Sequence, residues 1–115
     1  MEINEIQKVA DEWNKVTWVV IEFKDPGVDK IGKLFQKTCE IIEEYHKENL
    51  VPKEISSMLL EMYDFGRWVC DLHETPLHNR YQEIVSLIFD LNNCFLTGNY
   101  DFENIKDSIE ELLYK

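Results

Sequence analysis

Residues 52–73, PKEISSMLLEMYDFGRWVCDLH, decide the fold because their periodicity predicts one long helix with two distinct sides. At about 100° per residue, apolar positions collect on one side of this helix and acidic positions on the other. The apolar side carries Ile55, Leu59, Met62, Val69 and Leu72. The acidic quadrant carries Glu61, Asp64, Trp68 and Asp71. A helix with such an apolar stripe gains most of its stability by packing the stripe against other helices.

Trp68 is the unusual member of the acidic quadrant, because a ring as large as indole generally lies in a core. Tryptophan is common at the centres of binding surfaces, and neighbouring carboxylates would select a basic partner. Trp18 raises the same question, since it falls on the polar side of its own predicted helix. Either these tryptophans contact a partner, or they pack between helices of this chain. The candidate partner-binding residues are Trp18, Glu61, Asp64, Trp68, Asp71, Glu83 and Asp90.

Helical periodicity accounts for nearly the whole chain. The predicted helices span about residues 3–23, 29–48, 52–73 and 76–96, followed by a short helix after Asp101. The end of the first, VTWVVIEF, is also compatible with a short strand because it is rich in β-branched and aromatic residues. Gly66 lies inside the third helix, where a close helix crossing would explain it. Short connections between antiparallel helices predict an all-α, antiparallel up-and-down bundle of four to five helices, in one domain over residues 1–115.

The helix ends carry recognisable local signals. The turn Asp25-Pro26-Gly27 ends the first helix, because Pro and Gly both favour turns. Thr75-Pro76 is typical of an N-cap followed by a first-turn proline. Gly98 suits the position just after a helix, and Asp101 can cap the last one.

The net charge of −11 is unevenly distributed along the chain. Residues 1–53 hold eight lysines against eleven acids, whereas residues 54–105 hold only Arg67 and Arg80 against nine acids. Such a field repels nucleic acid and anionic lipid and attracts basic proteins. The same acidity could also serve only to keep a small protein soluble.

Other features of the sequence predict where the chain is located in the cell and whether it carries a metal or catalytic site. Three widely spaced cysteines, Cys39, Cys70 and Cys94, indicate reduced thiols rather than a disulfide framework. The charged start MEINEIQK has no apolar leader, and no run approaches about 18 apolar residues, so we expect a cytoplasmic chain without a membrane span. Glu43-x-x-His46 and Cys70-x-x-His73 are incomplete metal patterns, and we expect no metal, cofactor or catalytic residue.

One acidic pattern suggests an enzyme. Glu40-x-x-Glu43, followed by Glu61-x-x-Asp64, is similar to the pattern of the all-α nucleoside triphosphate pyrophosphohydrolases. That resemblance implies four carboxylates on two antiparallel helices holding Mg²⁺ against a triphosphate, in keeping with the preference of Mg²⁺ for oxygen ligands. A Mg²⁺-dependent pyrophosphohydrolase is therefore kept as an alternative to a binding protein.

Taken as a whole, the chain resembles the small immunity proteins of bacterial toxin systems, both colicin-type and those of contact-dependent inhibition. The resemblance lies in size, acidity, helical content and surface aromatics, with residues 96–102, LTGNYDF, similar to a helix–Gly–helix element in some of them. It implies binding and neutralising a basic toxin domain, often a nuclease, by a monomer or weak dimer. A second alternative is an acidic nucleic-acid mimic that inhibits a nuclease.

Overall fold

The computed structural model describes residues 3–48, 51–72, 75–99 and 101–114, and helices make up nearly all of this part. The helices are α1 (Ile3–Ile21), α2 (Val28–Tyr45), α3 (Lys53–Asp71), α4 (Pro76–Thr97) and α5 (Phe102–Leu113). The described residues contain no strand, so the stretch VTWVVIEF is helical up to Ile21. The all-α bundle predicted from the sequence is confirmed.

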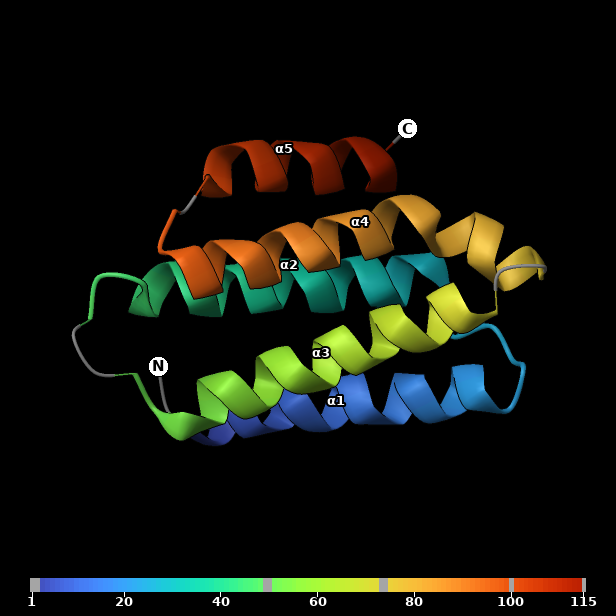
Figure 1. Cartoon of the computed structure of the whole chain (residues 1–115), viewed down its shortest axis with the longest axis horizontal. Helices are drawn as coiled ribbons and strands as arrows, with labels where there is room; N and C mark the ends of the chain where they lie inside the picture. Colours follow the sequence, from blue (N-terminus) through green and yellow to red (C-terminus); the bar gives the residue numbers. More distant parts are fainter. Residues whose placement is uncertain (1–2, 49–50, 73–74, 100, 115) are drawn as a thin grey trace.

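The helices form three layers (Figure 1). Successive helices run in opposite directions, but the most extensive contact joins α1 and α3, which run in the same direction. This pair packs through α1–α2 and α3–α4 contacts onto a layer made of α2 and α4. Helix α5 covers the other side of the α2–α4 layer. The outer face of the α1–α3 layer is therefore left without a covering helix among the described residues.

A chain of buried rings joins the four central helices. Trp13 and Phe65 lie with ring centroids 5.5 Å apart, and Phe65 meets Tyr81 edge-on at 6.0 Å. The indole N–H of Trp13 donates to Thr38 Oγ1 at 2.9 Å, so the polar atom of this fully buried ring has a partner. These contacts connect α1, α2, α3 and α4 through one cluster.

Two glycines allow close helix contacts. A Cβ on Gly66 would lie 3.0 Å from Phe89 Cε1, so the expected close crossing at Gly66 is confirmed as an α3–α4 contact. A Cβ on Gly32 would lie 2.2 Å from Leu113 Cδ2, which shows how closely α5 sits on α2. Both positions exclude a larger residue unless the facing side chain moves.

Helix ends follow the predicted caps with small shifts. Thr75 Oγ1 accepts from the His78 N–H, and Asp101 accepts from the Asn104 N–H at 3.3 Å. Gly98 adopts the left-handed conformation after α4. Helix α1 ends two residues before the predicted Phe23, and the predicted end of the third helix at His73 lies outside the described residues.

Phe23 ends α1 in an unusual way, with a positive φ of 62°. The Lys24 N–H bonds to Val19 O at 3.0 Å and the Phe23 N–H bonds to Val20 O at 2.9 Å, which is the Schellman pattern. Glycine normally occupies this left-handed position because a side chain is strained there. The ring of Phe23 is 73% exposed, so burial does not compensate for this strain.

Candidate functional site

The two tryptophans singled out by the sequence are both on the surface. Trp18 is 57% exposed and Trp68 is 42% exposed, whereas Trp13 on α1 is fully buried. Trp18 lies on α1 and Trp68 on α3, the two helices of the uncovered layer. The rings of Trp18 and Trp68 are therefore accessible to a partner and are not buried in the core.

A hydrogen bond fixes how the two tryptophans lie along α1 and α3. Asn14 Nδ2 donates to Glu61 Oε2 at 3.1 Å, which aligns the two helices at that level. Trp18 follows Asn14 by one turn, and Trp68 follows Glu61 by two turns. Because the helices run in the same direction and rise about 1.5 Å per residue, Trp68 lies about 4.5 Å, nearly one turn, further along the α1–α3 seam than Trp18.

Exposed carboxylates lie about one turn from these rings along their helices. Asp64 and Asp71 are exposed on α3, about one turn before and after Trp68. On α1, Glu22 is exposed one turn after Trp18. We call Trp18, Glu61, Asp64, Trp68 and Asp71 the acidic–aromatic face. Five of the seven candidate residues thus lie on one side of the molecule.

The other two candidates, Glu83 and Asp90, are exposed on α4 but lie toward α5. Glu83 lines a shallow cavity of about 360 Å³ with Ser108 and Glu111 of α5. Asp90 lines a second cavity that also includes residues of α5. The structure therefore does not bring these two residues together with the acidic–aromatic face, because the polar stripe of α4 turns toward α5 rather than toward α1.

Three of the four carboxylates of the pyrophosphohydrolase pattern have neighbours on different helices. Glu43 on α2 is ion-paired with Lys106 of α5, and Glu40 lines a cavity beside the same lysine. Glu61 instead bonds to Asn14 of α1. Within the described ranges, no group of three or more His, Cys, Asp or Glu side chains could hold a metal ion. The second metal pattern includes His73, which lies outside those ranges.

An apolar groove between α3 and α4 was not predicted. Its volume is about 550 Å³. The residues that line it are Ser56, Leu59, Leu60, Tyr63, Phe89, Asn92, Asn93, Phe95 and Leu96. Leu60 and Leu96 are large apolar side chains on the outer sides of their helices, and that mismatch is the sequence signal that could have indicated the groove.

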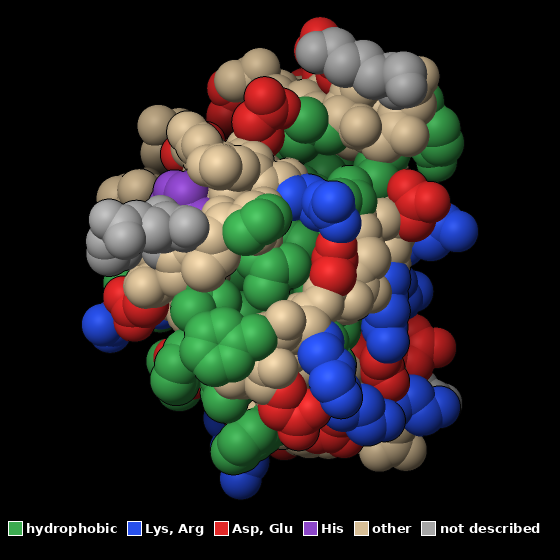
Figure 2. Space-filling view, turned by 90° about the vertical axis from the view of Figure 1, so that its right-hand side faces the viewer, with side chains coloured by type: hydrophobic (Ala, Val, Ile, Leu, Met, Phe, Trp, Pro, Cys, Tyr) green, Lys and Arg blue, Asp and Glu red, His purple; other side chains and the backbone are tan. Residues whose placement is uncertain are grey.

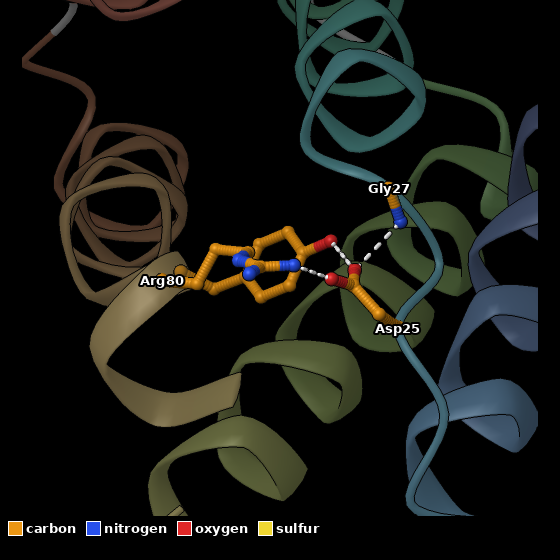
Figure 3. Close-up of polar contacts among 4 residues, drawn as sticks. Asp25, Gly27 and Arg80 are labelled. Atoms are coloured by element: carbon orange, nitrogen blue, oxygen red, sulfur yellow. Dashed lines mark hydrogen bonds and ion pairs between the residues drawn. The ribbon is translucent and has the colours of Figure 1, made fainter. Parts of the chain in front are cut away.

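A polar cluster holds the α1–α2 turn against α4 (Figure 3). The Asp25 carboxylate accepts hydrogen bonds from the Gly27 N–H at 2.9 Å, from the Tyr81 hydroxyl and from Arg80. Burial raises the pKa of Asp25, but the hydrogen bonds and the Arg80 charge outweigh it and hold that pKa below its ordinary value. Burial and the bond to Asp25 raise the pKa of Tyr81. We call these four residues the Asp25 cluster.

The end of the bundle that carries this turn has a mixed surface. Hydrophobic side chains gather on one side of it, while most of the Lys, Arg, Asp and Glu side chains lie on the other (Figure 2). Phe23 belongs to this end and lines a cavity of about 380 Å³ with Asp25, Leu77 and Arg80. Three exposed aromatic side chains lie near this end: Trp18 in the last turn of α1, Trp68 in the last turn of α3, and Phe23 just after α1.

Two further findings bear on function. None of the helices in the described part of the chain is long and apolar enough to cross a membrane. No protein family, curated protein or solved structure matches this chain. The acidic–aromatic face and the α3–α4 groove are therefore the features from which a function can be inferred.

Proposed function

We propose that this chain is an immunity protein that binds and neutralises a basic toxin domain, a nuclease, through the acidic–aromatic face. The observation that carries this proposal is the exposure of Trp18 and Trp68 among carboxylates on the uncovered α1–α3 layer. A surface of large rings surrounded by acids suits a basic protein partner.

The charge of the chain supports rapid capture of such a partner. A nuclease is basic around its active site because it holds phosphates, and an acidic inhibitor is drawn to that region. Electrostatic steering of this kind raises association rates to about 10⁸ M⁻¹s⁻¹ or more at low salt. The two tryptophans would then become buried in the complex and slow its dissociation.

Capture of the partner with matched variants tests this proposal. The wild-type chain is immobilised in lysate of its source organism at about 150 mM salt, where the Debye length is about 8 Å. Parallel columns carry Trp68→Ala and Asp64→Lys, with Tyr114→Ala and Glu110→Lys as controls that make the same changes at exposed positions on and just after α5. We expect one basic protein at equal stoichiometry on the wild-type and control columns, and little on the other two.

The captured protein is then expressed alone and together with this chain. Toxicity that the wild-type chain relieves and Trp68→Ala relieves poorly would support neutralisation by the acidic–aromatic face. A harmless partner would contradict the immunity function. Equal capture by Trp68→Ala, Asp64→Lys and the wild type would contradict the assignment of the face.

A further inference from the structure

The α3–α4 groove has an apolar floor and two apolar walls. Phe89 lies on the floor against Gly66, and its ring contacts Tyr63 in a tilted arrangement with centroids 5.4 Å apart. Leu60 forms the outer wall on α3 and is 60% exposed, while Leu96 on α4 is 78% exposed. Isolated exposed leucines are ordinary, but two that border one apolar groove make a contiguous patch.

The charges around the groove restrict what can occupy it. Among the described residues that line it there is no Lys, Arg, Asp or Glu, and the polar ones are neutral: Ser56, Asn92 and Asn93. Outside the lining, Asp64 follows Leu60 by one turn on α3, and Arg67 follows Tyr63 by one turn on the same helix. Asp90 lies on the α5 side of α4 rather than beside the groove. Across residues 54–105 acids outnumber cations nine to two. A neutral apolar groove in an acidic half of the chain fits an occupant with an apolar side and a basic side.

The length of the groove fits a helix. Its lining residues extend over Ser56–Tyr63 on α3 and over Phe89–Leu96 on α4. Each range is two helical turns, or about 10 Å. The apolar stripe of an amphipathic helix places side chains at i, i+3 or i+4, and i+7 over the same length.

We propose that the α3–α4 groove binds an amphipathic helix of the basic partner, with the apolar stripe of that helix in the groove and its cationic side toward Asp64. This proposal depends on the proposed function for one premise, which is that the partner is basic. A second copy of this chain is a poor occupant, because two chains of net charge −11 repel each other.

Synthetic peptides test the groove without the natural partner. The probe is a peptide of about 14 residues, made of lysine and leucine, with leucines spaced to form one helical stripe. One control peptide has the same composition with the stripe scrambled, and another replaces each lysine with glutamate. Calorimetry of the full chain gives affinity and stoichiometry, and amide NMR shifts locate the bound peptide.

Two groove variants and two controls identify the contact. Leu60→Ser and Leu96→Ser remove exposed side chains and should leave the fold intact, as circular dichroism will show. Each should weaken binding of the striped Lys/Leu peptide by about tenfold, the effect of losing one buried leucine from a contact. Tyr114→Ser, an equally exposed position away from the groove, and Trp68→Ala should leave that affinity unchanged.

The following outcomes decide the proposal. Saturable one-to-one binding of the striped Lys/Leu peptide, lost in both groove variants, would support it. Equal binding of the scrambled peptide or of the glutamate peptide would overturn it, as would unchanged affinity in both groove variants. Sedimentation of the wild type as a dimer that Leu96→Ser dissociates would assign the groove to a second copy and also overturn it. Failure of the acidic–aromatic face is distinguished by Trp68→Ala alone, because Asp64 borders both surfaces: this variant should lose capture of the partner but keep its affinity for the striped Lys/Leu peptide.

Discussion

Replacing Phe23 with glycine should make this protein more stable. The left-handed conformation at φ 62° costs a side-chain-bearing residue about 1–2 kcal/mol, and glycine avoids this strain. Glycine also gains freedom in the unfolded chain, which lowers stability by about 0.4–1 kcal/mol. Little burial is lost, because the ring is 73% exposed. The net expectation is a gain of about 0.5–1 kcal/mol in the free energy of unfolding, which corresponds to a rise in Tm of about 3–6 °C.

Urea and thermal unfolding followed by circular dichroism measure this change. The matched control is Phe23→Ala, which removes the ring but keeps a Cβ in the left-handed conformation, so its stability should stay within about 0.5 kcal/mol of the wild type. If Phe23→Gly lowers stability by about 1 kcal/mol or more, the ring contributes packing that its exposure does not suggest. Equal gains from both variants would show that the ring, rather than the backbone, is the source of strain.

Three other perturbations test the structure. Trp68→Ala should change stability by less than about 1 kcal/mol in urea unfolding, whereas Trp13→Ala, at a fully buried ring, should lower it by about 3–5 kcal/mol. Because the pKa of Asp25 is lowered in the folded state, its stabilising effect is present above the unfolded value of about 3.9 and is lost as pH falls through the folded value. Wild-type stability should therefore decrease more steeply than that of Asp25→Asn in acid titrations followed by fluorescence. Gly32→Ala should displace Leu113 and speed amide hydrogen exchange in α5 relative to α3, while an unchanged exchange pattern would show that the facing side chain adapts.

Most of the secondary structure could be predicted from the sequence because its causes are local. The stripe containing Ile55 and Met62 is buried in α3 as predicted. Thr75 and Asp101 cap their helices because a side-chain oxygen needs only a backbone N–H two or three residues ahead. A positive φ at Phe23 was not foreseen, since an aromatic residue gives no signal for a position that glycine normally fills.

The candidate site could be predicted only in part, because periodicity identifies a face of a helix and not the helix that covers it. Periodicity predicts Trp68 and Asp64 on one face because they share one helix. The sequence predicts Glu83 on the same surface, but its side of α4 lies toward α5. The groove was missed for the same reason, since Leu60 and Leu96 become neighbours only when α3 and α4 pack together.

The contact between α1 and α3 also has a consequence for synthesis and folding. Helix α1 makes its most extensive contacts with a helix that is not its neighbour in sequence, and Trp13 finds Phe65 only after α2 and the following connection have been made. A nascent chain containing α1 and α2 alone therefore exposes the part of the apolar stripe of α1 that packs against α3 until α3 leaves the ribosome. Long sequence separation between contacting residues slows folding, so this bundle should fold more slowly than a bundle of equal stability in which each helix pairs with the next. During that interval the unpaired stripe of α1 is the segment most available to chaperones and to aggregation.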